Sequence, residues 1–393
     1  YKSNIMEFWD TKSGIPQPHQ TKVMVIPNIT NSQNLEADSF IDVIFNHIAE
    51  LGDDFFWYIP LPSHVKRLDI YDNVEQINIT MSGNMFHMRV NFPIDIINLL
   101  QFSTMHPNDT KGKWFRDYDV VYSHLPDWSV RRYTPTKKKI IGYCHWWEMP
   151  ICNGKSNMNN HLNFEHEILG ALQMDTLYVN TVSQKDVVIE QAKEYFNDKQ
   201  LSKLSHIIQP FYLSIPKEEV VEAPLSDYSK VIVFNHRCAT YKGYPKFMKW
   251  MREYRNRRTD FKLWITQAKK FGQTFEEDWI MDTYLSKSNY FEALRKCGVI
   301  VTPYETHFGW SLSATDAMMK GTPVIFEECP NYREINPTAP FYGKENKEEM
   351  FALLDKMLDD SEYRMKSAHN ALERATELAN TKQFEELAKK LSN

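Results

Sequence analysis

Short apolar runs alternate along this chain with longer segments in which apolar residues recur every three or four positions. In the first half, strand-like runs occupy residues 22–27, 55–60, 77–79, 88–90, 118–123, 139–145 and 176–180. Helical spacing between them predicts helices at residues 35–51, 94–102 and 164–172. A fourth helix is predicted to begin at Ser183, which we interpret as its N-cap. Strands that alternate with helices at this length are typical of βαβ units, which build a parallel sheet.

A second alternating set follows a polar stretch at residues 213–228, which contains Pro216 and Pro224. Its predicted strands are residues 231–237, 261–265, 299–301 and 324–326. Its predicted helical segments are residues 245–255, 289–297, 314–320, 347–358 and 361–392. Because 393 residues are enough for two domains with separate cores, the pattern predicts an α/β protein with a parallel sheet in each half.

Composition narrows the class of protein. Hydrophobic residues make up 42% of the chain, yet no apolar run reaches the roughly eighteen residues that a membrane span needs. The N-terminal residues lack the charged and then apolar pattern of a signal peptide. The five cysteines form no CxxC pair, which favours reduced thiols and a cytoplasmic protein. The net charge of -5 argues against a surface that binds nucleic acid throughout.

Residues 299–335 carry the strongest functional signal, a buried strand followed by a loop, a helix and a second strand. Free backbone N–H groups and the helix dipole at such a junction favour an anion such as a phosphate. On the helix, Asp316 is expected to accept hydrogen bonds from ribose hydroxyls. The loop residues that we expect to contact the same ligand are Glu305, His307, Phe308 and Gly309.

The second signal is the segment FNHRCATYKG, in which Arg237 precedes Lys242 by five residues and Gly243 lets the backbone turn into a helix. Two fixed cations in this position would stabilise the negative charge that a diphosphate gains when it departs as a leaving group. Arginine binds phosphate oxygens bidentately, whereas lysine acts as a point charge. The alternative is a pair of solvated cations at a helix start, a position that the helix dipole disfavours.

Together these segments resemble the donor site of retaining glycosyltransferases with the GT-B fold. The R-x4-K-G step formed by Arg237 and Lys242 is similar to the diphosphate-clamping pair of the family 4-type enzymes. Asp316 stands where those enzymes carry a Glu that binds the ribose, although their two signature Glu residues lie closer together than Glu305 and Asp316. Residues 231–335 are also similar to the DNA α-glucosyltransferases of T-even phages.

The resemblance implies two Rossmann-like domains whose parallel sheets face an interdomain cleft. We expect an acceptor-side domain at residues 1–215 and a nucleotide-sugar-binding domain at residues 216–375. The last helix commonly crosses back to the first domain in GT-B enzymes, and residues 376–393 are expected to do so here.

His145 is the candidate from the N-terminal half. It ends an apolar strand, and a His at this strand end lies near the transferred sugar in the phage enzymes and their relatives. The resemblance therefore implies that His145 orients the sugar or the acceptor, whereas the alternative is a structural histidine beneath two tryptophans. His124 is similarly placed, and Glu148 is a weaker candidate for an acceptor-side acid or base, a solvated Glu being the alternative.

The implied activity is retaining transfer of a hexosyl or pentosyl group from a nucleotide-sugar, with UDP-sugar as the expected donor. The residues expected to be catalytic are His145, Arg237 and Lys242. We expect no metal requirement, because the two cations would take the place of a metal at the diphosphate.

The acceptor is left open by the sequence. We favour a 5-hydroxymethylpyrimidine in double-stranded phage DNA, because basic residues cluster at 131–139 and 252–258 and phosphate contacts supply most non-specific affinity for DNA. Such a base would have to be flipped out of the duplex. One alternative is a carbohydrate acceptor in cell-surface polysaccharide synthesis, and another is a non-catalytic nucleotide-sugar-binding protein. The sequence specifies neither the sugar nor the oligomeric state.

Overall fold

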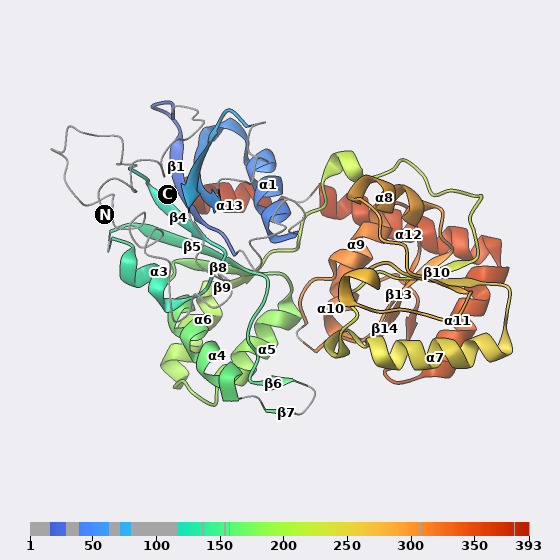
Figure 1. Ribbon diagram of the computed structural model, residues 1–393. Helices are drawn as coiled ribbons and strands as arrows, with labels where there is room; N and C mark the ends of the chain where they lie inside the picture. Colours follow the sequence, from blue (N-terminus) through green and yellow to red (C-terminus); the bar gives the residue numbers. More distant parts are fainter. Residues whose placement is uncertain are drawn as a thin grey trace. The chain divides into compact units, whose positions relative to one another are not determined.

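The computed structural model describes residues 16–28, 39–62, 71–79, 117–135, 137–152, 155–156, 158–306, 308–380 and 382–392. The strand expected at 88–90 and the helix expected at 94–102 lie outside these residues. The chain divides into two compact units (Figure 1). The first comprises Tyr1–Phe211 and Lys382–Asn393, and the second comprises Tyr212–Thr381.

The first unit is built on a seven-stranded sheet in which every neighbouring pair of strands is parallel. In sheet order the strands are β3 (Val74–Ile79), β2 (Phe55–Pro62), β1 (Thr21–Ile26), β4 (Val120–Ser123), β5 (Lys139–Cys144), β8 (Thr176–Val179) and β9 (Ile208–Pro210). Successive strands are added outward on both sides of the β1–β4 pair, which is the doubly wound order of Rossmann-like folds. A short antiparallel pair, β6 (Ile151–Cys152) and β7 (Lys155–Ser156), lies apart from this sheet.

The predicted runs within the described residues form β1, β2, β3, β4, β5 and β8, because strands that are buried on both faces read as continuous apolar runs. The short strands β6, β7 and β9 were not predicted. Residues 23–26 of β1, for example, are all fully buried. Val23 is in register with Trp57 of β2 on one side and with Val120 of β4 on the other.

Apart from the helices at 128–133 and 198–207, which were not predicted, the helices of the first unit depart from the prediction mainly at their ends. They are α1 (Ser39–Leu51), α3 (Trp128–Tyr133), α4 (Met158–Ala171), α5 (Val182–Ala192), α6 (Asp198–Ile207) and α13 (Gln383–Ser392), with a 3-10 turn η3 (Gly52–Asp54). The N-cap prediction for Ser183 is wrong, because Thr181 caps α5 by accepting a hydrogen bond from the backbone N–H of Gln184. Helix α6 was not predicted, although Asn197 and Gln200 form a capping box at its start.

The C-terminal helix belongs to the first unit. The single segment predicted at residues 361–392 is interrupted, so that α12 (Ser361–Ala379) and α13 are separate helices. Helix α13 packs against α1 and β1 (Figure 1). It buries Phe384, Leu387 and Leu391 on the side that meets them.

The second unit repeats the architecture with a six-stranded, entirely parallel sheet. Its strands are, in sheet order, β12 (Ile280–Met281), β11 (Lys262–Ile265), β10 (Val231–Phe234), β13 (Val299–Thr302), β14 (Val324–Glu327) and β15 (Phe341–Tyr342). Its helices are α7 (Tyr244–Arg257), α8 (Lys287–Arg295), α9 (Leu312–Met319), α10 (Pro330–Ile335), α11 (Lys347–Asp359) and α12, with 3-10 turns η5 (Lys217–Glu219), η6 (Thr240–Lys242) and η7 (Lys269–Phe271).

Helix α9 begins two residues before the predicted start because Ser311 caps it by accepting a hydrogen bond from the Ala314 N–H at 3.2 Å. Its predicted stop at Gly321 is confirmed, since that residue has φ 71° and follows the last turn. A Cβ at Gly321 would lie 2.9 Å from Pro224 Cα, so the close approach also requires glycine.

A fully buried arginine ties α12 to the sheet of the second unit. The Arg364 guanidinium donates hydrogen bonds to the backbone carbonyls of Gly298 at 3.0 Å, Cys297 at 2.9 Å and Leu225 at 3.3 Å. It also lies 3.6 Å from the centroid of the Tyr228 ring. These contacts fix the start of β13, and with it the loop that follows the strand.

Candidate functional site

Polar residues collect at the carboxyl edge of the sheet in the second unit. Strand β13 lies between β10 and β14, and all three run in the same direction, so the loops that follow them emerge side by side. Residues 235–243 follow β10, residues 303–311 follow β13, and Glu327 ends β14. Ligands of open parallel sheets bind at this edge, next to the point where the strand order reverses.

Gly243 brings the first two loops together. It ends η6 and precedes α7 with φ 70°, a backbone conformation that L side chains rarely adopt. A Cβ at this position would lie 2.8 Å from Pro303 Cβ, closer than side-chain carbons normally approach. Only glycine therefore allows η6 to lie against the start of the loop that follows β13.

This approach places Lys242 beside Glu305. The two side chains form an ion pair in which the carboxylate is 2% exposed and the lysine 18% exposed. The alternative that Lys242 is a solvated surface cation is therefore wrong. Glu305, expected to contact the ligand, faces this lysine in the structure, and a contact between Glu305 and a sugar stays a prediction.

Arg237 and Lys242 both contact Tyr241. The Arg237 Nη1 donates a hydrogen bond to the tyrosine hydroxyl at 3.4 Å, and the Lys242 Nζ lies 5.5 Å from the ring centroid. Arg237 is exposed, whereas Lys242 is partly buried. The structure thus brings both expected cations to one short turn, and their role as a diphosphate clamp stays a prediction.

Asp316 lies on α9 and is connected to the end of β10. It accepts a hydrogen bond from the Tyr290 hydroxyl at 3.3 Å, and Tyr290 in turn accepts one from Asn235 Nδ2 at 2.8 Å. Asn235 Nδ2 also donates to the Ser313 carbonyl at 2.8 Å, and Ser313 Oγ donates to the Asn235 carbonyl at 2.7 Å. The sequence interpretation missed Asn235 and Tyr290, and the position of Asn235 directly after the apolar run VIVF was the available signal.

The loop after β13 is held from several sides. The Tyr332 hydroxyl donates to the Pro303 carbonyl at 2.8 Å, and Asn331 Nδ2 donates to the Gly309 carbonyl at 2.7 Å. Phe308 has φ 50°, an uncommon backbone conformation for a non-glycine residue. His307, also expected to contact the ligand, lies outside the residues described.

Glu327, at the end of β14, anchors the same loop. Its fully buried carboxylate accepts hydrogen bonds from Lys246 Nζ at 2.8 and 3.0 Å and from the backbone N–H groups of Tyr304 and Glu345, both at 2.9 Å. This network satisfies the buried charge and joins α7 to the loops after β13 and β15. Sequence reasoning did not identify Glu327 because its partners are distant along the chain.

Several buried polar atoms at this edge make no hydrogen bond within the described part of the chain. They are Asn235 Oδ1, His236 Nε2, Thr302 Oγ1 and Trp310 Nε1. Buried polar atoms are normally satisfied by protein, water or ligand, so this edge has hydrogen-bonding capacity beyond what its own side chains use.

His145 lies at the carboxyl edge of β5 in the first unit, inside a cluster of aromatic rings. Its ring centroid is 4.7 Å from that of Tyr143 and 5.5 Å from that of His124. Burial lowers the pKa of His145 to about 3 and that of His124 well below its usual value. The His145 imidazole is therefore neutral at pH 7, suited to hydrogen bonding rather than to storing a proton.

Glu148 is also buried rather than solvated, and its backbone N–H donates a hydrogen bond to Glu167 Oε2 at 2.9 Å. The neighbouring Trp147 is fully buried and packs edge-on against Phe164. The solvated alternative for Glu148 is therefore wrong, and its role as an acceptor-side acid or base stays a prediction.

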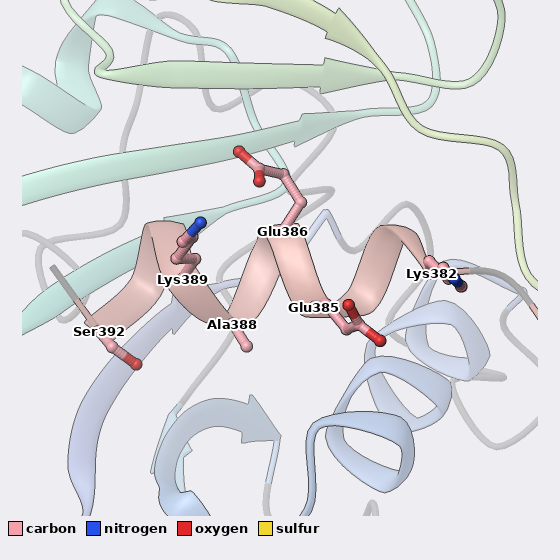
Figure 2. Close-up of a pocket in the computed structure, with 6 residues that line it drawn as sticks. All are labelled: Lys382, Glu385, Glu386, Ala388, Lys389 and Ser392. Carbon is pink, nitrogen blue, oxygen red and sulfur yellow. The ribbon is translucent and has the colours of Figure 1, made fainter.

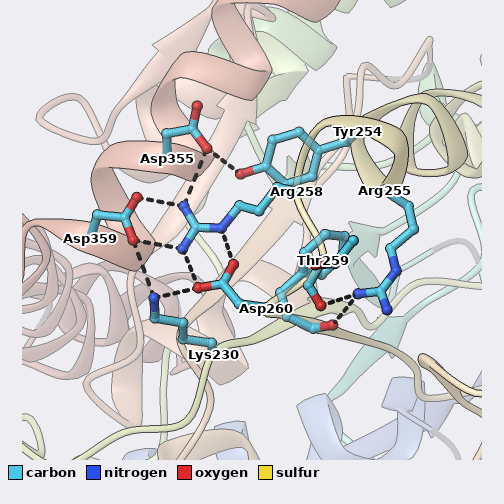
Figure 3. Close-up of polar contacts among 9 residues, drawn as sticks. Lys230, Tyr254, Arg255, Arg258, Thr259, Asp260, Asp355 and Asp359 are labelled. Carbon is cyan, nitrogen blue, oxygen red and sulfur yellow. Dashed lines mark hydrogen bonds and ion pairs between the residues drawn. The ribbon is translucent and has the colours of Figure 1, made fainter.

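The arginines at 252–258 do not form a free basic surface. Arg252 pairs with Glu277, and Arg257 forms a bidentate pair with Glu348. Arg255 donates to the carbonyls of Thr259 and Phe261, and Arg258 bonds Asp260, Asp355 and Asp359, a network that Lys230 completes (Figure 3). The interpretation of this stretch as contacts for DNA phosphates is therefore not supported.

The other basic stretch is similarly engaged. Arg131 donates to the Lys138 carbonyl at 2.9 Å and lies 3.8 Å from Asp175. Lys138 bonds the Tyr118 carbonyl and pairs with Asp117 at 3.4 Å. Both residues thus have intramolecular partners.

A hollow lies beside α13 (Figure 2). It is lined by Lys382, Glu385, Glu386, Ala388, Lys389 and Ser392. None of the residues predicted to form the site lines this hollow.

Among the residues described, no group of three His, Cys, Asp or Glu side chains is arranged to hold a metal ion. In the same part of the chain, no helix has the length and apolar character needed to cross a bilayer.

No protein-family model and no curated protein matches this sequence. Solved structures match it over nearly its whole length at low identity. A sucrose-phosphate synthase from Thermosynechococcus elongatus matches with a TM-score of 0.65 and 10% identity, covering 95% of this chain and 98% of its own. The Anabaena protein HepE, in complex with UDP and glucose, matches with a TM-score of 0.66 and 11% identity, covering 95% of this chain and 100% of its own.

A third match is the trehalose-6-phosphate structure from E. coli bound with UDP-2-fluoro glucose, with a TM-score of 0.63 and 12% identity, covering 95% of this chain and 99% of its own. At these identities the likeness establishes architecture alone. The chain therefore has the GT-B fold, with two units that each contain a parallel sheet, and the fold prediction is confirmed.

Proposed function

We propose that this protein is a glycosyltransferase that moves a sugar from a UDP-sugar to a hydroxyl group of a carbohydrate acceptor. The observation that carries the proposal is the pairing of Lys242 with Glu305 at the carboxyl edge of a parallel sheet, the edge from which the segments that carry Arg237 and Asp316 also emerge. The GT-B likeness supports it, since HepE is described with UDP and glucose, and another similar structure with UDP-2-fluoro glucose.

In this proposal the diphosphate binds between η6 and the start of α9. Arg237 and Lys242 neutralise the charge that develops on the diphosphate, and the backbone N–H groups at the start of α9 add to that stabilisation. Lys242 would leave Glu305 for the diphosphate, so Glu305 would become available to the sugar hydroxyls. Asp316 accepts hydrogen bonds from the ribose, and Phe308 and Gly309 contribute backbone groups.

The transfer itself is retaining. The acceptor oxygen forms its bond to the anomeric carbon on the face from which the diphosphate departs, and the acceptor proton leaves with the diphosphate oxygen. The protein positions the reactants and stabilises charge rather than forming a covalent intermediate. In the first unit, the neutral His145 imidazole orients a hydroxyl of the sugar or acceptor by hydrogen bonding, and no metal ion is required.

The ion pairs of one arginine-rich segment support a carbohydrate acceptor. Arginines 252, 255, 257 and 258 already have carboxylate or carbonyl partners, so binding DNA phosphates with them would cost those ion pairs. A carbohydrate acceptor has no such requirement. A 5-hydroxymethylpyrimidine in phage DNA is the competing acceptor, and a binding protein without transfer activity is the competing class.

UDP release from a panel of UDP-sugars tests the proposal, with simple sugars, sugar phosphates, hydroxymethylcytosine DNA or unmodified DNA added as acceptor. We expect release that depends on a sugar acceptor and is lost in Lys242→Ala. Lys230→Ala is the matched control, because Lys230 also pairs with carboxylates in the second unit but lies in the network of Figure 3.

Each other outcome has a distinct meaning. Release that requires modified DNA would move the acceptor to DNA, and binding of UDP-sugar without any release would indicate a binding protein. Proton NMR of the product would report the anomeric configuration, and inversion would contradict the retaining mechanism.

A further inference from the structure

A chain of hydrogen bonds with a defined direction ends at Asp316. An amide nitrogen can only donate, so the 2.8 Å contact between Asn235 Nδ2 and Tyr290 requires the tyrosine oxygen to accept. The single hydroxyl proton of Tyr290 is then directed to its other neighbour, Asp316 Oδ2, at 3.3 Å. Burial and the charge of Asp316 raise the pKa of Tyr290 well above its usual value, which keeps that proton in place.

The same asparagine also fixes the helix that carries Asp316. Its Nδ2 donates to the Ser313 carbonyl, and its own carbonyl accepts from Ser313 Oγ, so the end of β10 is bonded twice to the first turn of α9. Asn235 is 2% exposed, so these hydrogen bonds are shielded from bulk water. The position of Asp316 is therefore set by α9 and its carboxylate is contacted by Tyr290. Asn235 is hydrogen-bonded to both α9 and Tyr290.

We propose that Tyr290 is a positioning residue that aims Asp316 at a vicinal diol of a nucleotide ligand. The proposal rests on the proposed function, because the diol is that of the ribose in the UDP-sugar. By occupying Asp316 Oδ2, the tyrosine hydroxyl determines the direction from which ribose hydroxyls approach the carboxylate. Tyr290 thus contributes to selection of ribonucleotides without touching the ligand.

The substitution Tyr290→Phe isolates this effect. The ring of Tyr290 packs against Trp264 and Phe291, with centroid distances of 6.1 and 5.4 Å, and phenylalanine keeps both contacts. Asn235 Nδ2 retains its bond to the Ser313 carbonyl, so α9 stays attached to β10. The variant consequently loses the hydroxyl and the hydrogen bond that the hydroxyl accepts from Asn235, while the ring contacts and the attachment of α9 remain.

The experiment is calorimetric binding of UDP and of its 2′-deoxy and 3′-deoxy analogues, together with KM and kcat for the UDP-sugar. For Tyr290→Phe we expect UDP to bind roughly three- to tenfold more weakly, the loss typical of one hydrogen bond. We expect a smaller loss for the analogue that lacks the hydroxyl held by Asp316, so discrimination falls. KM should rise while kcat is nearly unchanged.

Two further variants control the result. Asp316→Asn should lose the same discrimination, and adding Tyr290→Phe to it should change discrimination no further. Tyr254→Phe is the matched control, because the Tyr254 hydroxyl donates to Asp355 at 2.6 Å in the same unit but outside the site (Figure 3). It should lower thermal stability and leave discrimination at the wild-type value.

The outcomes separate this proposal from the function on which it rests. Absence of UDP binding by the wild-type protein would overturn both. UDP binding with wild-type discrimination in Tyr290→Phe would overturn the positioning role alone. Should Tyr290→Phe fail to fold, wild-type discrimination in Asp316→Asn would overturn the positioning role together with the proposed ribose contact of Asp316. An equal loss of discrimination in Tyr254→Phe would also overturn it, since the effect would then reflect general destabilisation.

Discussion

Lys242 and Glu305 form an ion pair that links the turn after β10 to the loop after β13. The carboxylate is almost fully buried and the lysine partly so. Each side chain therefore neutralises the charge of a partner that is largely shielded from water. The pair is both a structural link between the two loops and the proposed resting state of the diphosphate site.

Removing one partner should destabilise the protein more than removing both. Lys242→Ala leaves a buried carboxylate without its cation, and we expect it to lower the free energy of unfolding by about 1–3 kcal/mol. Lys242→Ala combined with Glu305→Gln should cost less than the sum of the single changes. Urea denaturation of the four proteins measures the coupling in a double-mutant cycle.

The exposed pair Lys296–Glu292 provides the comparison, because its side chains are 60% and 62% exposed. Lys296→Ala should change the free energy of unfolding by no more than about 0.5 kcal/mol. Equal effects of Lys242→Ala and Lys296→Ala would contradict the structural importance of the buried pair.

Gly243→Ala should weaken both the fold and donor binding. The alanine would have to keep a backbone φ of 70°, and its Cβ would lie 2.8 Å from Pro303 Cβ, which would force η6 away from the loop. We expect a loss of about 2–3 kcal/mol in unfolding free energy, with the ion pair disturbed as well. Gly272→Ala is the matched control, because its φ is 63° and no atom lies within 4 Å of the position that an added Cβ would take.

The control should show only the backbone cost, about 1 kcal/mol. If both alanine variants lose the same stability, the close contact with Pro303 contributes nothing. A higher KM for the UDP-sugar in Gly243→Ala than in Gly272→Ala would indicate that Lys242 has moved.

Acid should destabilise the first unit through its buried histidines. Burial lowers the pKa of His47 and of His145 to about 3, from an ordinary value of 6.5. Because the unfolded chain binds these protons at higher pH than the folded chain does, the stabilisation is fully present above pH 6.5. It is lost progressively as the pH falls from 6.5 toward 3.

At pH 5 each histidine should lower the free energy of unfolding by about 2 kcal/mol relative to its value at pH 7. His47→Gln retains a hydrogen-bonding side chain beside Tyr122 but cannot titrate. Its unfolding free energy should therefore depend less steeply on pH between about 5 and 6.5, as urea titrations at several pH values would measure. A wild-type slope in the variant would show that His47 does not contribute.

Arg364→Met should be among the most destabilising single changes in the second unit. It leaves the carbonyls of Gly298, Cys297 and Leu225 without their buried donor, at a cost of about 2–4 kcal/mol. Arg374 is the matched arginine on α12, because it also donates to backbone carbonyls but is 19% exposed. Arg374→Met should cost less since water can replace its hydrogen bonds, and thermal denaturation of both variants compares them.

The longer strands could be predicted because buried parallel strands are continuous apolar runs, as in the β1 segment VMVI. The strands of two or three residues, which are β6, β7, β9, β12 and β15, are too short to show such a run and were missed. The sequence was less informative about helix ends. Thr181 rather than Ser183 caps α5, and either hydroxyl would satisfy the same local pattern. The choice depends on how α5 packs against the rest of the unit, which a local pattern does not contain.

The candidate site divides in the same way. Lys242 and Gly243 could be singled out because they stand in a short local pattern at the start of a helix, although their contacts with Glu305 and Pro303 could not be predicted. The partners of Asn235, which lie 55 and 78 residues away, and those of Arg258, which lie as far as 101 residues away, could not be predicted either. Arg258 therefore looked like a free cation until the fold supplied its carboxylates.

Glu327 has a mechanical consequence. Its carboxylate holds α7 through Lys246 and the loop after β13 through the backbone of Tyr304, so neither segment can be displaced alone without breaking a buried, charged hydrogen bond. The two segments, which would form walls of the proposed donor site, are thereby coupled to each other. Any adjustment to ligands of different size must come from side chains or from the far end of the loop, beyond Tyr304.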